Sequence, residues 1–405
     1  MFSLALLIGV YSYIIYSLGT VHVLTKTNII AATAIYLIVL FVYYRKKIAV
    51  VLEESYLKTK LKTIFVLLRG ELVFLIAFLL IFIQAIVNFI GALGPELAFD
   101  ALWYHLTLPK LYLMNQSIDV IHGGLFYYSG MPQLGEMLYT ASLAVGSETI
   151  AKVVHFIFGL LTTLAVYKTA KTVFPRRIAI FASLIFYTNL VVAWESTTAY
   201  IDLIRAFFEI MAVRGFINWV KEGKRQWFLE SACLVGLAIC TKLLAVGSLG
   251  IFSILLIAYG IRKGMGVKGV IWVVVQYVGT ALLVVVPWFM RAFLATGNPF
   301  YPLFSNYEVH QTVVDIVNPI RLVSSFWNIF THAADPLNPV YILFFPILVF
   351  MLYRFFIRVE NPLRLPLVKG RDQYMFYYLC LYGVVSLFVW YVTPQTGGGR
   401  FILPY

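Results

Sequence analysis

The chain has 405 residues, of which 61% are hydrophobic and only 12% are charged. A soluble domain is nearer to half apolar and a quarter charged, so this composition excludes an ordinary soluble protein. Repeated apolar runs of about 17–25 residues are typical of transmembrane helices. The runs are too long and too uniformly apolar for the strands of a membrane barrel. We therefore predict an all-α polytopic membrane protein.

The formal net charge is +13. Cytoplasmic loops rich in Lys and Arg explain this charge most simply. Nucleic-acid binding would need a basic surface on a soluble module, and the sequence contains no such module. Cys233, Cys240 and Cys380 lie in apolar segments without CxxC or Cys/His spacing, so we predict neither a disulfide framework nor a cysteine metal site.

The apolar segments predict about eleven transmembrane helices, and the basic loops between them set their direction. A Lys/Arg-rich segment that ends near Arg69 follows the first two helices and is expected in the cytoplasm. The predicted spans cover residues 2–19, 28–44, 71–93, 150–170, 178–194, 200–219, 227–244, 246–261, 270–289, 339–357 and 373–392.

Residues 94–149 form the first large loop on the predicted extracytoplasmic side. The apolar piece 134–146 follows Pro132 and is only about 13 residues long, so it is too short for a crossing. A crossing there would also place the next basic loop outside. We expect residues 134–146 to form an interfacial helix on the outer surface, and residues 103–112 to form another.

The start of this loop, from Phe99 to Lys110, combines Asp100, Tyr104 and His105. Charged residues near membrane depth are costly, so each is a functional candidate. Asp100 could instead cap an interfacial helix, and His105 could simply make a hydrogen bond at the interface. Taken together, these side chains predict the first wall of an active site, in which a carboxylate takes a proton from an acceptor hydroxyl.

A second acidic turn on the same side contains Glu195, Tyr200 and Asp202. Asp202, Arg205 and Glu209 follow one another at spacings of three and four residues, so they share one face of a helix. A buried structural ion pair between helices is the alternative. A buried carboxylate beside an arginine stays ionised and suits either role.

Cationic residues are also predicted on the extracytoplasmic side, although the positive-inside rule places most Lys and Arg residues in the cytoplasm. Lys242 ends an outgoing span, and Arg291 and Arg400 follow the last two outgoing spans. Lys242 could snorkel to the interface, and the turn from Thr296 to Pro302 could be plain loop chemistry. The alternative is that these cations neutralise the phosphate of a lipid substrate.

These residues resemble, in their order and sidedness, the GT-C-fold glycosyltransferases. That group uses polyprenyl- or dolichyl-phosphate sugars and includes protein O-mannosyltransferases and lipid A aminoarabinose transferases. The likeness covers residues 71–405. The matching features are Asp100 after the first core span, Pro132 before 134–146, Ala199-Tyr200-Ile201-Asp202, Gly236-Leu237-Ala238-Ile239-Cys240-Thr241-Lys242, Pro287-Trp288 with Arg291 and the turn Gly297-Asn298-Pro299-Phe300-Tyr301-Pro302, and Arg400-Phe401-Ile402-Leu403-Pro404.

The resemblance implies a GT-C-like bundle with interfacial helices in the first outer loop. Residues 71–405 would be the catalytic domain, and residues 1–70 a two-span addition with a basic cytoplasmic linker. It also implies an inverting transfer of a hexose or pentose from a polyprenyl-phosphate donor to a lipid, glycan or protein acceptor. The implied site residues are Asp100 as acceptor-activating base with His105 as the second catalytic residue, Lys242 with Arg291 or Arg400 on the donor phosphate, and Glu195, Asp202, Tyr200 and Tyr104 on the substrate.

The expected location is the inner or plasma membrane of a prokaryotic cell, with an extracytoplasmic active site and membrane lipids around it. No cofactor is demanded by the sequence, although the outer carboxylates could hold Mg²⁺ or Mn²⁺. A transporter or flippase, an O-antigen ligase-like or polymerase-like enzyme, and a non-catalytic membrane subunit are the alternatives. Residues 401–405 are typical of the start of a further span, so we expect the chain to be a fragment.

Overall fold

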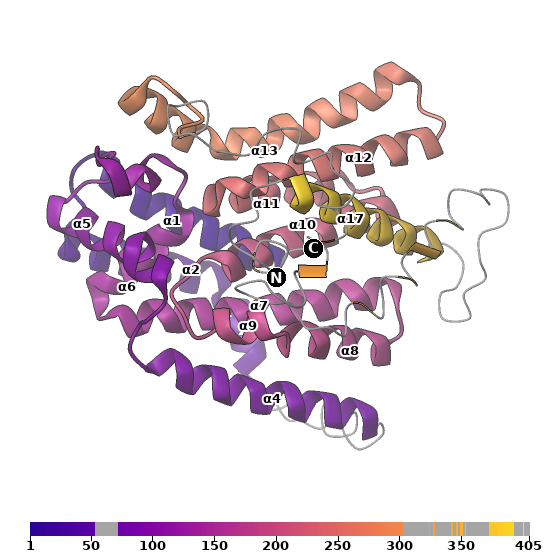
Figure 1. The fold of residues 1–405 in the computed structure, drawn as a ribbon, viewed down its shortest axis with the longest axis horizontal. Coiled ribbons are helices and arrows are strands. Elements are labelled where there is room, and N and C mark those ends of the chain that lie inside the picture. Colours follow the sequence, from indigo (N-terminus) through magenta and orange to yellow (C-terminus); the bar gives the residue numbers. More distant parts are fainter. Residues whose placement is uncertain are drawn as a thin grey trace.

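The structure is a computed structural model that describes residues 1–52, 72–302 and 372–392, Arg400, and scattered residues between 324 and 353. Within these residues it is a bundle of helices without a strand (Figure 1), so the predicted all-α class is confirmed. The elements are α1 (Phe2–Thr20), α2 (Lys26–Leu52), α4 (Leu72–Leu93), η1 (Ala101–His105), α5 (Thr107–Asn115), η2 (Gly124–Gly130), α6 (Leu134–Val145), α7 (Glu148–Val173), α8 (Arg176–Tyr187), α9 (Leu190–Glu195), α10 (Asp202–Glu222), α11 (Arg225–Thr241), η3 (Leu243–Ala245), α12 (Val246–Arg262), α13 (Val267–Thr296) and α17 (Asp372–Val392).

Helix α10 lies at the centre of the bundle. It packs against α7 and α11, and α11 packs in turn against α13. In Figure 1, α4 runs along one edge of the bundle and α13 along the opposite edge. Most of the side chains of α10 are buried, including Phe207, Phe208 and Phe216. Because other helices surround its first turns, Asp202, Arg205 and Glu209 are buried with it, whereas Lys221 and Glu222 in its last turn are exposed.

Two glycines allow the helices on both sides of α11 to approach it closely. A Cβ atom on Gly215 of α10 would lie 3.0 Å from the Cβ of Ser231. A Cβ atom on Gly236 of α11 would lie 2.5 Å from the carbonyl oxygen of Ala281 in α13. Small residues at such crossings let backbones meet within a membrane bundle. The packing fixes the start of α10 relative to the end of α11.

Seven helices are long and apolar enough to cross a membrane by length and composition: α1, α2, α4, α7, the segment Leu243–Arg262, α13 and the segment Tyr374–Tyr391. The predicted total of about eleven therefore stays a prediction. The segment predicted as one span at 178–194 is interrupted, because α8 ends at Tyr187 and α9 starts at Leu190. The side chain of Asn189 caps α9 by accepting a hydrogen bond from the Val191 N–H at 3.1 Å. The predicted span at 339–357 lies mostly outside the described residues.

The first large loop folds into η1, α5, η2 and α6, which gather at one end of the bundle (Figure 1). The prediction that 134–146 lies on the outer surface is wrong: every residue of α6 from Leu134 to Ala144 is buried. Helices α1, α2, α5 and α7 pack around it. Since α1 covers α6 directly, the first predicted span is part of the core, and the division of the chain at residue 70 stays a prediction.

Helix α13 is longer than the predicted span 270–289. It continues through Pro287 and Arg291 to Thr296 and ends where Gly297 adopts a positive φ of 74°. The hydroxyl of Tyr16 in α1 donates a hydrogen bond to the Pro287 carbonyl at 2.8 Å. This contact ties α1 to the end of α13 that faces the loop elements.

Candidate functional site

Asp100 and Arg400 form an ion pair at the start of η1. The guanidinium Nη1 lies 2.7 Å from Oδ2 of Asp100, and both side chains are 13% exposed. Arg400 also lies over the ring of Tyr200, 4.9 Å from its centroid. Asp100 occupies the position before η1, but its side chain makes no capping hydrogen bond. The helix-cap interpretation of Asp100 is therefore wrong, and the carboxylate is left to face a cation.

Lys242 and Asp202 form a second ion pair, between the end of α11 and the start of α10. The Lys242 ammonium donates to both carboxylate oxygens, at 2.8 and 2.9 Å. The lysine side chain is 15% exposed, whereas that of Asp202 is fully buried. The snorkelling interpretation of Lys242 is wrong, because a carboxylate holds the ammonium in place. Lys242 is nevertheless the more exposed partner of the pair.

The two ion pairs share one electrostatic environment. Burial lowers the pKa of Arg400, but Asp202, Asp100 and Glu195 raise it more, so it lies above its usual range. Burial and the carboxylates of Asp100 and Asp202 raise the pKa of Tyr104. Both carboxylates thus act on the same neighbours, and we refer to Asp100, Tyr104, Tyr200, Asp202, Lys242 and Arg400 as the paired-charge cluster.

Aromatic rings form part of this cluster. Tyr104 stacks in parallel on Tyr128, with ring centroids 3.9 Å apart. The hydroxyl of Tyr200 accepts a hydrogen bond from the backbone N–H of Asp100 at 3.2 Å. Burial raises the pKa of Tyr200 to about 12, so the phenol stays protonated at neutral pH. Tyr200 therefore contacts both members of the Asp100–Arg400 pair, one through its hydroxyl and one through its ring.

Buried polar side chains hold the backbone beneath the cluster. Glu96 accepts hydrogen bonds from the two following N–H groups at 2.9 Å each, and from the N–H of Ala199 at 2.6 Å. The Lys152 ammonium donates to the carbonyls of Gly94 and Pro95, at 2.8 and 3.0 Å. These bonds join the loop before Asp100 to the turn before Asp202. The sequence analysis missed Lys152, although a lysine inside an apolar helix is a recognised signal.

His105 lies behind the cluster and is 1% exposed. Its Nδ1 is 2.7 Å from Oε1 of Glu136 in α6, and its ring centroid is 4.1 Å from that of Tyr104 and 5.7 Å from that of Tyr200. Among the described residues, Nε2 of His105 has no hydrogen-bond partner. The structure thus places His105 between α6 and two aromatic residues of the cluster. Sequence reasoning missed Glu136, although a carboxylate in an apolar segment could have indicated it.

The π-helical geometry around His105 follows from one extra residue in the turn. Residues 101–105 form a π-helical turn, closed by the Leu106 N–H donating to the Ala101 carbonyl at 2.9 Å. Such single π turns often occur at functional sites because they redirect side chains. Here the turn lets Tyr104 and His105 both face inward, while Leu102 stays exposed.

Glu195 is fully buried at the turn before α10. Its Oε2 is 3.8 Å from Nε2 of His155. That nitrogen accepts the Leu203 N–H at 3.2 Å, and Nδ1 lies 2.8 and 2.9 Å from the carbonyl oxygens of Glu195 and Thr198. The pattern fits a neutral imidazole protonated at Nδ1. His155 therefore shapes the turn that carries Glu195, Tyr200 and Asp202.

Arg205 and Glu209 are fully buried on α10, one and two turns beyond Asp202. Glu209 accepts a hydrogen bond from the Ser248 hydroxyl at 2.5 Å. Arg205 helps to neutralise Glu209 and Asp202. Asp202 pairs with Lys242 at the helix end, and a structural ion pair between Arg205 and Glu209 stays a prediction.

Arg291 contacts the loop rather than the paired-charge cluster. Its guanidinium donates to the carbonyls of Ile118, Ser129 and Met131, the last at 3.2 Å. These bonds brace the loop against α13, and the predicted role on a phosphate stays a prediction. Lys110 also points elsewhere and pairs with Glu148.

The described residues include no group of three His, Cys, Asp or Glu side chains that could hold a metal ion. Asp100 and Asp202, the best-placed carboxylates, already contact cations. A resident Mg²⁺ needs several free oxygen ligands, and this donor set does not fit one. Cationic side chains provide the positive charge of the cluster.

Comparison with known proteins supports the resemblance drawn from the sequence. Residues 132–290 match the family described as dolichyl-phosphate-mannose-protein mannosyltransferase. No curated protein sequence matches the chain. The solved structure of ArnT from Cupriavidus metallidurans bound to undecaprenyl phosphate is similar, with 15% identity and a TM-score of 0.54 over 80% of this chain and 57% of ArnT. The apo structure of the same protein gives 15% identity, a TM-score of 0.52 and the same coverage.

The chain thus spans a little over half the length of the solved structures it matches, 57%. At 15% identity the likeness shows the fold alone. The GT-C-like bundle predicted from the sequence is confirmed, and the chain shares the fold of ArnT.

Proposed function

We propose that the chain is an integral membrane glycosyltransferase that moves a sugar from a polyprenyl-phosphate donor to an acceptor hydroxyl. The observation that carries this proposal is the Asp100–Arg400 pair beside the Lys242–Asp202 pair. A carboxylate and two cations in one partly buried cluster provide a base and a phosphate site together. The fold of ArnT, whose structure holds undecaprenyl phosphate, supports the choice of donor.

In this proposal Asp100 is the base. The proton of the acceptor hydroxyl passes to its carboxylate as the acceptor oxygen attacks the anomeric carbon. The bond from that carbon to the phosphate oxygen breaks on the opposite face of the sugar, so the configuration inverts. Two contacts fix the orientation of the carboxylate. Arg400 pairs with it, and the Tyr200 hydroxyl accepts a hydrogen bond from the Asp100 backbone N–H.

Lys242 and Arg400 neutralise the departing lipid phosphate. Lys242 is suited to this because its side chain is the more exposed partner of the pair, while Asp202 is fully buried. Asp202 then orients the ammonium. The negative charge of Glu195 helps to stabilise the charged form of Arg400. Tyr104, stacked on Tyr128, offers an aromatic wall for the sugar or the prenyl chain. His105 supports that wall from behind through Glu136.

The remaining expectations belong to the same proposal. The Lys/Arg-rich loops support an extracytoplasmic position for the paired-charge cluster, and we propose a prokaryotic inner or plasma membrane as its location. The acceptor is a lipid, a glycan or a protein with a free hydroxyl.

The direct test is sugar transfer by the purified full chain with a panel of polyprenyl-phosphate hexoses and pentoses. Asp100→Asn should lower turnover by about 10²- to 10⁴-fold, the usual contribution of a general base. Asp119→Asn is the matched control, because Asp119 lies on the same loop with a side chain that is 66% exposed. Turnover of Asp100→Asn equal to that of the control would contradict the role of Asp100.

A second test separates donor binding from chemistry. Lys242→Ala should weaken donor affinity, and Lys242→Arg should retain part of it because the charge is kept. Lys110→Ala is the control, since Lys110 also pairs with a glutamate, Glu148, but in an exposed position. Donor affinities that match in the Lys242 and Lys110 alanine variants, measured on folded protein, would remove Lys242 from the phosphate site.

A further inference from the structure

A pocket of about 460 Å³ lies at the other end of the helices that carry the paired-charge cluster. Helix α10 starts at Asp202 and ends at Glu222, a length of about 30 Å. Helix α12 starts four residues after Lys242 and ends at Arg262. The pocket lies between the last turns of α10 and α12 and the first turns of α17. Its lining residues are Val220, Lys221, Tyr259, Arg262, Lys263, Tyr374, Met375 and Tyr378.

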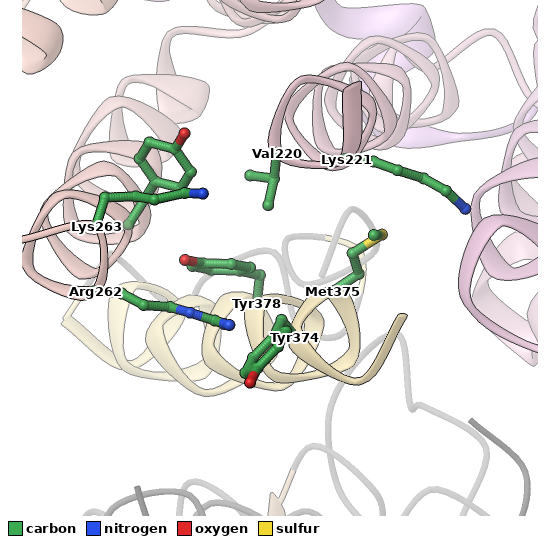
Figure 2. Close-up of a pocket in the computed structure, with 8 residues that line it drawn as sticks. Val220, Lys221, Arg262, Lys263, Tyr374, Met375 and Tyr378 are labelled. Atoms are coloured by element: carbon green, nitrogen blue, oxygen red, sulfur yellow. The ribbon is translucent and has the colours of Figure 1, made fainter. Parts of the chain in front are cut away.

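The side chains of this pocket combine cations with tyrosines. Figure 2 shows Arg262 extending toward Tyr374 and Tyr378, and Lys221 on α10 with its ammonium directed away from these two tyrosines. The Lys263 ammonium lies over the Tyr259 ring, 5.8 Å from its centroid. The Arg262 guanidinium lies over the Tyr374 ring, 3.0 Å from its centroid. Tyr378 lines the pocket on the same helix as Tyr374, one turn further along. Tyr374 thus holds Arg262 against α17 and leaves the rest of the pocket open.

Positive charge dominates the pocket. None of its described lining residues is acidic. Glu222, which follows Lys221 in sequence, pairs instead with Lys224 at 2.8 Å and accepts the indole N–H of Trp227 at 3.0 Å. Residues 354–372, which lead to the start of α17, contain five Lys or Arg, one Glu and one Asp, so basic residues outnumber acidic ones there.

Helix dipoles account for only part of this charge. Lys221 and Arg262 lie in the last turns of α10 and α12, where cations offset the partial negative charge of free carbonyls. Two helix ends supply about one negative charge between them. The start of α17 contributes partial positive charge at the same place. Most of the charge of Arg262 and Lys263 remains to be neutralised from outside the helices.

We propose that this pocket binds the phosphate headgroup of an acidic phospholipid in the leaflet opposite the paired-charge cluster. Basic pockets between transmembrane helices on the cytoplasmic side are typical sites for such headgroups. The guanidinium of Arg262 and the ammonium of Lys263 contact the phosphate, and the tyrosine hydroxyls donate to its oxygens. The acyl chains follow the apolar surfaces of α12 and α17 into the bilayer. The site is separate from the proposed sugar transfer, and its test does not use that activity.

The test compares two lysines of equal charge at the same end of the protein. Lys263 lines the pocket, whereas Lys268 is an exposed lysine in the first turn of α13 outside the pocket lining. The full chain is placed in nanodiscs of phosphatidylcholine with increasing phosphatidylglycerol, and lipid retained after detergent exchange is counted by native mass spectrometry. Lys263→Gln should weaken phosphatidylglycerol retention about fivefold, since a basic residue near an acidic lipid contributes about that factor. Lys268→Gln should leave it within about twofold.

Arg262→Gln combined with Lys263→Gln should weaken retention further, and thermal unfolding in neutral detergent verifies that this variant is folded. Equal losses in the Lys263 and Lys268 variants would mean diffuse attraction and would overturn the site. Retention without preference for phosphatidylglycerol over phosphatidylcholine would overturn it as well. Inorganic phosphate is the third arm: protection against thermal unfolding equal to that by phosphatidylglycerol would assign the pocket to a soluble phosphate and overturn the lipid.

Discussion

The cations that lie near the two ends of α10 have opposite surroundings. At the start of the helix, Lys242 and Arg400 each contact a carboxylate, and the carboxylate of Asp202 is fully buried. At its last turns, Lys221, Arg262 and Lys263 surround a pocket whose described lining holds no acid. The first arrangement fixes side chains in one geometry, because each charge is satisfied within the protein. The second leaves charge for an external anion.

This difference has an energetic consequence that mutations can measure. Removing a cation from a buried pair leaves its carboxylate without compensation, which is strongly unfavourable. Removing a cation from a group of like charges relieves repulsion. The same kind of substitution should therefore change stability in opposite directions at the two ends of the helix.

The largest effect is expected for Lys242→Ala. Because Asp202 is fully buried, breaking the pair should cost about 3–5 kcal/mol of unfolding free energy. The measurement is denaturant unfolding in detergent, with Lys110→Ala as control. The exposed Lys110–Glu148 pair should contribute about 0–1 kcal/mol. A double substitution, Lys242→Gln with Asp202→Asn, should recover much of the loss, and a full additive loss would contradict the pairing.

A smaller loss is expected for Glu136→Leu, which tests the support behind the cluster. The substitution leaves Nδ1 of buried His105 without its acceptor. An unsatisfied buried donor costs about 1–3 kcal/mol. Adding His105→Phe removes both polar groups and should restore part of the stability. If the double variant is no better than the single one, the contact between the two side chains is not what stabilises this region.

Tyr200→Phe should cost about 1 kcal/mol, the usual net value of one hydrogen bond. It removes the acceptor of the Asp100 N–H but keeps the ring under Arg400. We expect a modest fall in turnover through the orientation of Asp100, with donor affinity unchanged. Steady-state kinetics at several donor concentrations separates the two, and a loss confined to donor affinity would assign the hydroxyl to the substrate instead.

The smallest effect is expected for Lys263→Gln in uncharged detergent at low salt. Relief of like-charge repulsion should stabilise the protein slightly, by no more than about 0.5 kcal/mol. Added salt should remove the gain because it screens exposed charges. A destabilisation above about 1 kcal/mol would show that a carboxylate of the chain compensates Lys263, and the comparison between the two ends would fail.

Much of the fold could be predicted because helix formation in a membrane depends on local hydropathy. The apolar runs gave α4, α7, α10 and α17 within a few residues of their bounds. The structure differs from the prediction where a contact with another part of the chain overrides the local hydropathy. Asn189 interrupts an apolar run by capping α9, and α6 is buried because α1 and α2 cover it.

The candidate site was only partly predictable, for the same reason. Sidedness and residue type indicated Asp100, Asp202, Lys242 and Arg400, since charges near a membrane are costly wherever they occur. Glu136 and Lys152 are also charged residues in apolar segments, but their burial depends on the helices packed around them, which the sequence does not reveal. The contacts of Arg291 with loop carbonyls could not be foreseen, because backbone acceptors carry no sequence signal.

The sequence by itself determined the class of the protein and the list of unusual polar residues, because hydropathy and charge are properties of each segment alone. Only the tertiary structure decided which of these residues meet. Asp100 reaches Arg400, and Asp202 reaches Lys242, through the packing of helices that are far apart in the chain. An ion pair forms where two helix ends converge, and convergence depends on every crossing between them, including those that Gly215 and Gly236 permit.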